Sequence, residues 1–154
     1  MIRRICHTTS KSNTIREFLE LPVERKVFYQ KWEIMLFAAA IGFEACQKAE
    51  LVDSNGVRDA DSGSAVDFST FDASGCWPGF LDAISLVEYS DPDCLKSDDS
   101  SIEMRVKTFE EYANFGLSVL SEETVYEMNP VQLADFILKQ LPDEPKKIPD
   151  VIFE

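Results

Sequence analysis

His7 is the only histidine in the sequence, and it directly follows Cys6. An imidazole beside a thiol could serve as a metal-ligand pair or as a nucleophile with its base. Adjacent residues rarely converge on one ion, however, and no third ligand lies nearby in the sequence. A Ser–His–Asp arrangement would need the same histidine, and the chain shows no strand–turn–helix nucleophile elbow. We therefore expect neither a metal site nor a catalytic centre here, in what reads as an irregular, mobile, basic N-terminal segment over residues 1–13.

An acidic segment offers the second candidate for metal chemistry, through the oxygen ligands Asp53, Asn55, Asp59 and Asp61. A calcium-binding EF-hand needs oxygen ligands at alternate positions, a glycine at the sixth position and a glutamate at the twelfth. Counting from Asp53, Gly56 stands at the fourth position; counting from Asp59, the twelfth residue is Thr70. Both registers fail, so the segment predicts a solvated loop and no metal.

Paired carboxylates are the third candidate, because two acids that share a site can act as general acid and base. The pairs in this sequence are adjacent: Asp98–Asp99, Glu110–Glu111 and Glu122–Glu123. Neighbours on a helix point about 100° apart, so we interpret all three pairs as solvated positions. The six glycines form no phosphate-binding loop before a helix. The sequence thus predicts a protein that is not an enzyme and needs no cofactor.

The spacing of the four cysteines, Cys6, Cys46, Cys76 and Cys94, matches no zinc or redox motif. Arg3 and Arg4 are not followed by an apolar stretch of the kind a secretion signal needs. No apolar run reaches the roughly 20 residues that a bilayer requires. We therefore expect a reduced, cytoplasmic protein without a membrane segment.

The net charge of −13 is distributed unevenly along the 154 residues. Residues 1–50 carry eight Lys and Arg against six Asp and Glu, whereas residues 51–154 carry seven against 22. Such a field repels nucleic acid from most of the surface and attracts basic partners. Direct contact with DNA would have to use the N-terminal region, where the candidate residues are Arg3, Arg4, Lys11 and Arg16.

One segment, Ile34–Ile41, is apolar without interruption and rich in Ala, Leu and Met. These residues favour a helix, and a helix that is apolar on all sides is buried on all sides. We predict a central core helix over about residues 24–49, around which the other helices pack. Its alanines allow close approach of a neighbour, and Gly116 in a later helix is the expected partner of Ala38–Ala40, with Gly42 as a second small contact.

The remaining pattern predicts a mainly α-helical protein, a compact bundle of about five helices. Further helices are expected after the capping box Thr14–Glu17, over Pro78–Tyr89, from the capping box Ser100–Glu103 to about Glu122, and over about Pro130–Leu141. Asn55–Gly56 suits a tight turn, so residues 51–60 form either a small β-hairpin or a loop. We expect one domain, residues 1–141 with the basic N-terminal segment, followed by an extended proline-containing tail, residues 142–154.

Three segments resemble the small proteins encoded beside DNA phosphorothioation (Dnd) genes, the Dnd system-associated proteins. They are the core helix Lys31–Phe43, then Phe80–Ile84 followed by Asp91–Pro92, then Phe109–Leu117, which reads FEEYANFGL. The family pattern of the last segment is FEEYANGGL-like, and Phe115 here replaces its second glycine. The resemblance covers about residues 25–122.

The resemblance implies a bacterial or archaeal accessory protein of a DNA modification and defence system, and it transfers no catalytic residue. We expect a non-enzymatic adaptor that contacts other components of the modification or restriction system, with DNA reached through the complex. Trp77 suits either the core or an interface, and with Tyr112, Asn114 and Phe115 it forms the candidate partner interface. Two alternatives stay open: an acidic DNA mimic that regulates a DNA-binding protein, and a weak DNA-binding accessory protein.

Overall fold

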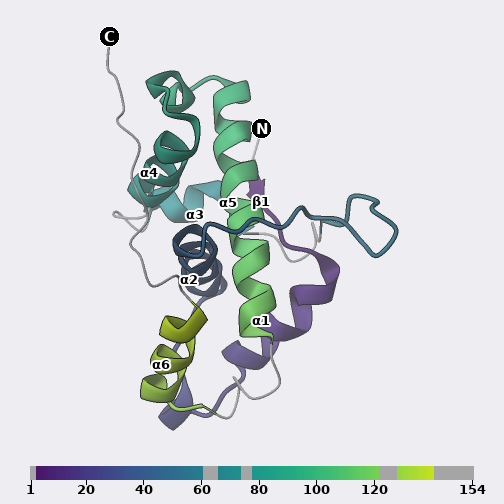
Figure 1. The fold of residues 1–154 in the computed structure, drawn as a ribbon, viewed down its shortest axis with the longest axis vertical. Helices are drawn as coiled ribbons and strands as arrows, with labels where there is room; N and C mark the ends of the chain where they lie inside the picture. Colours follow the sequence, from purple (N-terminus) through teal and green to yellow (C-terminus); the bar gives the residue numbers. More distant parts are fainter. Residues whose placement is uncertain (1–2, 61–65, 74–77, 122–127, 141–154) are drawn as a thin grey trace.

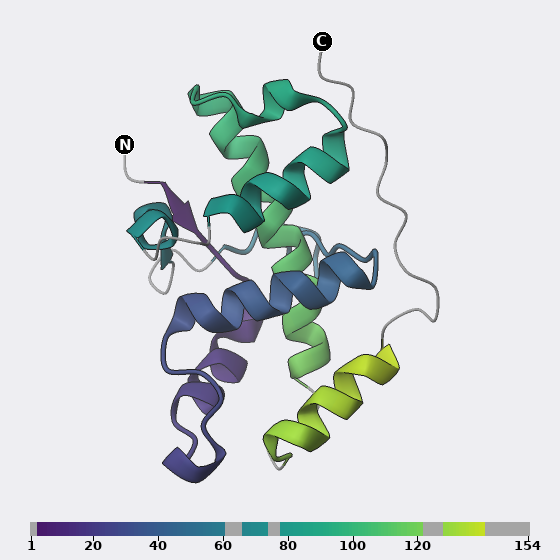
Figure 2. The same cartoon turned by 90° about the vertical axis from the view of Figure 1, so that its left-hand side faces the viewer.

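Two crossed helices form the centre of the fold. The computed structural model describes residues 3–60, 66–73, 78–121 and 128–140. Helix α5 (Asp99–Leu120) runs along the molecule (Figure 1). Helix α2 (Lys31–Glu44) lies across it, as Figure 2 shows. A Cβ atom placed on Gly116 of α5 would lie only 2.7 Å from the Cα of Ala38 in α2. The predicted approach of Gly116 to the alanines of α2 is therefore confirmed, with the two backbones in direct contact.

The other described helices pack around this crossing. They are α1 (Ser12–Leu19), α3 (Phe68–Ala73), α4 (Pro78–Tyr89) and α6 (Pro130–Gln140), together with 3₁₀ turns at Thr9–Lys11, Val23–Arg25 and Pro92–Leu95. The predicted mainly α-helical bundle is thus confirmed. Its core consists of apolar side chains from each of the longer helices and from the N-terminal segment: Ile5, Phe18, Ile34, Met35, Ala38, Ala39, Leu81, Ile84, Phe109, Ala113, Leu117, Leu120, Leu133 and Ile137.

A short two-stranded sheet ties the N-terminal segment to the middle of the chain. Strand β1 (Arg4–Ile5) pairs antiparallel with β2 (Val66–Asp67), so that Arg4 faces Asp67 and Ile5 faces Val66. Ile5 is completely buried, and so is His7, with 1% of its surface exposed. The interpretation of residues 1–13 as an irregular, mobile segment is therefore wrong for Arg4–His7, because the pairing of β1 with β2 and the burial of Ile5 and His7 fix that part of the chain against the core.

The central helix is shorter than predicted. It begins at Lys31, because Gln30 and Glu33 form a capping box in front of it, and Phe28 turns into the core before that point. It ends at Glu44, two residues before Cys46, whose φ of 56° cannot continue a right-handed helix. The predicted range of 24–49 thus includes a loop at each end.

The side of α2 that faces away from α5 is also less enclosed than its sequence suggested. Leu36, Phe37 and Ala40 are only partly buried, because α5 covers one side of the helix only. Together with Phe28, Trp32, Glu33 and Phe80, they line an open apolar groove of about 350 Å³. The expectation that α2 is buried on all sides is therefore wrong.

Two predicted helix starts are shifted. Helix α1 begins at Ser12, before Thr14, and α5 begins at Asp99, where the carboxylate of Asp98 accepts the N–H of Ser101. The start of α6 is as expected, since the Asn129 side chain accepts the N–H groups of Val131 and Gln132. Trp77, the pair Glu122–Glu123 and the predicted tail 142–154 lie outside the described residues. In the described part of the chain, no helix is long and apolar enough to cross a membrane.

Candidate functional site: a cleft beside Glu110

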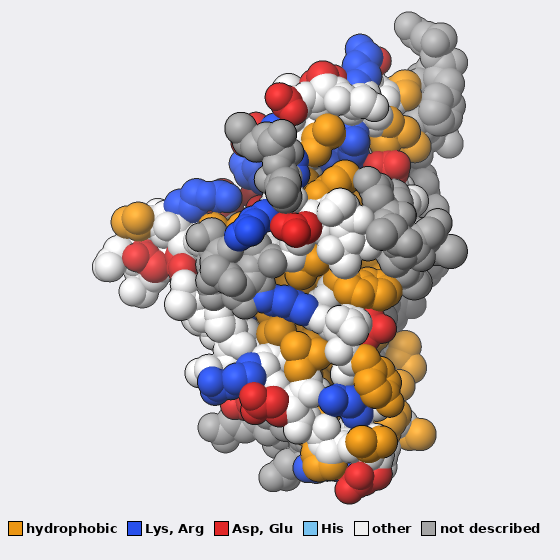
Figure 3. All heavy atoms as spheres, turned by 180° about the vertical axis from the view of Figure 1, so that it is seen from behind, with side chains coloured by type: hydrophobic (Ala, Val, Ile, Leu, Met, Phe, Trp, Pro, Cys, Tyr) orange, Lys and Arg blue, Asp and Glu red, His pale blue; other side chains and the backbone are white. Residues whose placement is uncertain are grey.

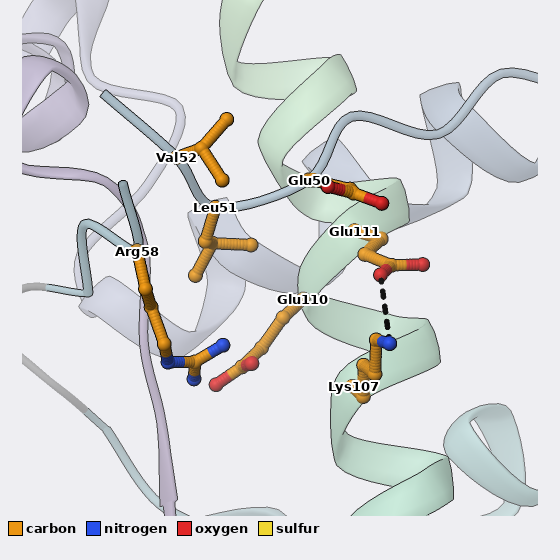
Figure 4. A pocket seen from close by; sticks show the side chains of 7 residues that line it. All are labelled: Glu50, Leu51, Val52, Arg58, Lys107, Glu110 and Glu111. Carbon is orange, nitrogen blue, oxygen red and sulfur yellow. Dashed lines mark ion pairs between the residues drawn. The ribbon is translucent and has the colours of Figure 1, made fainter. Parts of the chain in front are cut away.

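A cleft opens between α5, the N-terminal segment and the loop 50–58. Its larger hollow, of about 530 Å³, is lined by Arg3, Arg4, Cys6, Arg58, Glu103, Val106, Lys107 and Glu110. A smaller hollow, of about 140 Å³, adjoins it and is lined by Glu50, Leu51, Val52, Arg58, Lys107, Glu110 and Glu111 (Figure 4). Arg58, Lys107 and Glu110 line both hollows, so these three residues stand at the middle of the cleft.

A tight turn positions Arg58. The carboxylate of Asp53 accepts the N–H groups of Asn55 and Val57, and Gly56 takes a φ of 76° that favours glycine. The chain then returns so that Arg58 pairs with Val52 in an isolated antiparallel bridge. The residues predicted to form a hairpin or a loop thus form a minimal hairpin. Arg58 lies on the returning side of this hairpin, where its side chain lines the cleft.

Glu110 is the buried acid of the cleft. Its residue is 4% exposed, and its carboxylate Oε1 accepts the backbone N–H of Cys6 at 2.7 Å. Figure 4 shows the Arg58 guanidinium and the Glu110 carboxylate turned toward each other. Burial raises the pKa of Glu110 to about 7, although the Cys6 hydrogen bond and the Arg58 charge both act to lower it. The carboxyl therefore changes its charge near neutral pH.

The other cations of the cleft, including Arg4 beside Asp67, have carboxylate neighbours at 3.5–3.8 Å. Arg3 lies 3.5 Å from a carboxylate oxygen of Asp99 and 3.8 Å from one of Glu103, and it donates to the Asp99 backbone carbonyl at 3.1 Å. The Nζ of Lys107 lies 3.8 Å from Glu111, the ion pair dashed in Figure 4. These ion pairs exceed ordinary hydrogen-bond distances, so the carboxylates hold the cations loosely, and Arg3 is fixed by its bond to the Asp99 carbonyl.

Polar contacts from α5 fix the surroundings of the cleft. The Asn114 amide donates to the backbone carbonyls of Ala49 and Glu50, and the hydroxyl of Thr8 donates to its oxygen at 3.2 Å. Asn114 thus ties the N-terminal segment and the loop entering the hairpin to the same helix turn. The cleft walls are held together by a buried side chain that is 5% exposed.

The predicted partner-interface residues occupy several environments. Tyr112 is 3% exposed, and its hydroxyl donates to Glu88 of α4 at 2.7 Å. Burial, and next the bond to Glu88, raise the pKa of Tyr112. Asn114 is buried as described, and Phe115 is partly buried. Trp77 lies outside the described residues. Contact of this set with a partner stays a prediction, in which Phe115 is the described member that retains an exposed surface.

The predicted DNA contacts do not gather in one place, and on the face drawn in Figure 3 the Lys and Arg side chains lie scattered among side chains of other types. Arg3 and Arg4 line the cleft, whereas Arg16 lines a separate hollow with Ser12 and Lys31. Lys11 is partly buried, and desolvation lowers its pKa. DNA contact by these residues therefore stays a prediction, for which the structure brings two of the four together.

Sequence reasoning missed Glu110, Arg58, Lys107 and Cys6 as cleft residues. Glu110 was interpreted as a solvated position, and its burial shows that this was wrong. A signal was present, because Glu110 follows Val106 by four residues and precedes Ala113 by three, which places it on the buried stripe of α5. Arg58 carried no such signal, because its place depends on the turn that precedes it.

The charges that line this cleft suit it to the binding of a charged group. Among the described residues, no three His, Cys, Asp or Glu side chains are grouped so that they could hold a metal ion. Arginine side chains bind oxyanions through several N–H donors at once. Four cations and two carboxylates line the larger hollow, so its walls favour an anion once Glu110 is neutral.

These observations define a small, mainly α-helical protein with a charged cleft and an open apolar groove. The chain matches the family described as DNA sulphur modification system-associated protein 4 over residues 4–149, and it belongs to that family. The predicted resemblance to the Dnd-associated proteins is thereby confirmed. No curated protein and no solved structure matches the chain.

Proposed function

We propose that this protein is a non-enzymatic accessory component of a DNA sulphur modification system and that it acts in the cytoplasm by binding another protein of that system. Membership of the family supports the accessory role. The observation that carries the proposal is the open apolar groove along α2, lined by Phe28, Trp32, Leu36, Phe37, Ala40 and Phe80.

The groove is suited to a protein segment because its walls are aromatic and aliphatic. Glu33 is the one charged residue among its described lining residues, and the Glu33 carboxylate already accepts the N–H groups of Tyr29 and Gln30. Contiguous exposed apolar surface is typical of protein interaction sites, and this supports the proposal. Aromatic residues at such a site supply large contact areas.

The occupant we favour is an apolar segment of a different protein that carries basic residues beside it. With a net charge of −13, two copies of this chain repel each other, whereas a basic partner is attracted. A second copy in the groove is the competing outcome. A DNA-mimic role through the acidic surface remains the alternative, and it differs in salt dependence because charge attraction is screened within about 8 Å at physiological ionic strength.

The test is binding of the full-length chain to each purified protein component encoded with it, measured by calorimetry at low and high salt. Leu36→Gln places a polar group in the groove, and Ala40→Gln fills it; Val131→Gln, at a residue 78% exposed on α6, is the matched control. We expect one component to bind at both salt concentrations and each groove variant to weaken binding at least about tenfold, the equivalent of about 1.4 kcal/mol.

Circular dichroism of each variant shows whether its fold is intact. Binding that tolerates both groove variants, or that disappears at high salt, would contradict the proposal. Self-association of the chain that is lost in Ala40→Gln would assign the groove to a second copy and contradict it as well.

A further inference from the structure

The cleft beside Glu110 concentrates positive charge in a strongly acidic chain. Arg3, Arg4, Arg58 and Lys107 come from three separate parts of the sequence, and the fold brings them to one hollow of about 530 Å³. Two carboxylates, those of Glu103 and Glu110, share this lining. A concave site with several cations focuses its field on an anion more strongly than the same charges on a flat surface.

Carboxylates of the chain pair with Arg3, Arg4 and Lys107 at distances of 3.5–3.8 Å. Glu103 and Glu111 lie 3.8 Å from Arg3 and Lys107, and the side chain of Lys107 is 67% exposed. In each of these pairs one partner is largely exposed to solvent, and long ion pairs that solvent reaches contribute little to stability, from about 0 to 1 kcal/mol. A ligand oxygen at hydrogen-bond distance can therefore replace them at small cost.

Arg58 is the cation of the cleft best placed to bind an external anion. Within the described part of the chain, no carboxylate lies within ion-pair distance of it, and it faces the buried Glu110 (Figure 4). Since the pKa of Glu110 is raised to about 7, its carboxyl is neutral in part of the molecules at neutral pH. In those molecules Arg58 faces an uncharged partner.

We propose that this cleft binds a tetrahedral oxyanion of the phosphate or sulfate type, with Arg58 and Lys107 as its principal ligands and Arg3 and Arg4 at its rim. The oxyanion is either a free ion or a phosphodiester of a DNA backbone, which present the same oxygens to the guanidinium groups. The cleft and the apolar groove share no lining residue, so this inference stands apart from the proposed protein contact.

The experiment is a titration with sulfate, whose charge is constant between pH 6 and pH 8, followed by NMR of the ¹⁵N-labelled full chain. The backbone N–H of Cys6 is the reporter, because it is bonded to Glu110. We expect its resonance and those of Arg58 and Lys107 to shift with saturation. Arg58→Gln should weaken the affinity about tenfold or more, since it removes charged hydrogen bonds.

Arg25→Gln is the matched control, because Arg25 is exposed and lines neither hollow of the cleft; it should leave the affinity unchanged. Arg58 is itself exposed, so its replacement leaves the fold intact, which a thermal melt verifies. Lys107→Gln provides a second variant with the same expected direction. Glu110→Gln keeps a neutral side chain in place and should raise the affinity at pH 8 toward its value at pH 6.

A 12-base-pair DNA duplex identifies the source of the oxyanion. If the duplex displaces sulfate and its binding is lost in Arg58→Gln, the ligand is a backbone phosphodiester; if it does not compete, the ligand is a free ion. Sulfate that shifts no cleft resonance, or affinity that falls equally in Arg58→Gln and Arg25→Gln, would overturn the proposal.

Discussion

Replacing Gly116 by alanine should push α2 away from α5. The added Cβ would lie 2.7 Å from the Cα of Ala38, where ordinary contacts are 3.4–4 Å. The obstructing atoms belong to the α2 backbone, so no side-chain rotation can relieve the overlap. Overpacking a close-packed interior costs about 1–3 kcal/mol and sometimes more, and a rigid obstacle places this variant at the upper end.

Two effects modify this cost. Alanine is favoured over glycine inside a helix by about 1 kcal/mol, which offsets part of the loss. Separation of the helices also loosens fully buried neighbours on both of them, such as Met35, Ala39, Phe109 and Leu117, and a gap of less than 1 Å already loses about a quarter of the dispersion energy. The net expectation is destabilisation by about 2 kcal/mol or more, a decrease of about 4–8 °C in Tm for a chain of this length.

The assay is urea unfolding followed by circular dichroism, with Gly79→Ala as the matched control. Gly79 lies near the start of α4, and a Cβ there would meet nothing within 4 Å, so the control should be neutral or gain up to about 1 kcal/mol. Gly42→Ala should behave like Gly116→Ala, because its Cβ would lie 2.9 Å from the carbonyl carbon of Tyr112. Equal stability of Gly116→Ala and Gly79→Ala would refute the backbone contact.

Three further predictions concern the polar residues of α5. The pKa of Glu110 rises from 4.5 to about 7 on folding, so the folded state binds the extra proton between these values. The contribution of Glu110 to stability should therefore be complete below about pH 4.5 and be lost as the pH rises through 7. Urea midpoints measured in Glu110→Gln should lose this pH dependence, and an unchanged dependence would contradict the prediction. Asn114→Ala should cost about 2 kcal/mol because it takes the Asn114 donor from the Ala49 carbonyl and leaves the Glu50 carbonyl with the N–H of Val52 alone. A loss no larger than that of Ser118→Ala, at an exposed residue on the same helix, would count against this role of Asn114. Tyr112→Phe should lower the free energy of unfolding by about 1 kcal/mol in the same assay, because the bond to Glu88 is lost. Glu88→Gln should then cost less stability in the Tyr112→Phe variant than in the wild-type protein.

The elements with strong local signals were predictable from the sequence. Helix α4 spans Pro78–Tyr89 as expected, because a proline suits the first helical position and Asp91–Pro92 prevents continuation. The contact between α5 and α2 was predictable for a related reason. A glycine inside a regular helix is unfavourable unless another backbone lies against it, and the alanines of α2 offered the matching surface.

The short sheet was not predictable, because its strands are two residues long and lie about 60 residues apart in the sequence. Two residues are too few to show an alternation of apolar and polar side chains. The pairing of the strands depends instead on where the packed helices place these two segments. The charged cleft was missed for the same reason. Arg58 approaches Glu110 only after the 53–56 turn and the N-terminal segment are in place. The Asn55–Gly56 dipeptide signals the turn, but no local pattern predicts where the N-terminal segment lies.

The FEEYANFGL segment connects several parts of the fold, because three of its polar residues each form a hydrogen bond with a different neighbour. Glu110 holds Cys6, Tyr112 holds Glu88 of α4, and Asn114 holds Thr8 and the loop entering the hairpin. Most of these groups are committed inside the chain, but Glu110 also faces Arg58 across the cleft. An anion that draws Arg58 away would favour the neutral form of Glu110, which accepts the Cys6 hydrogen bond less strongly. Occupation of the cleft and the attachment of the N-terminal segment should consequently be coupled, because both depend on the charge of one carboxyl.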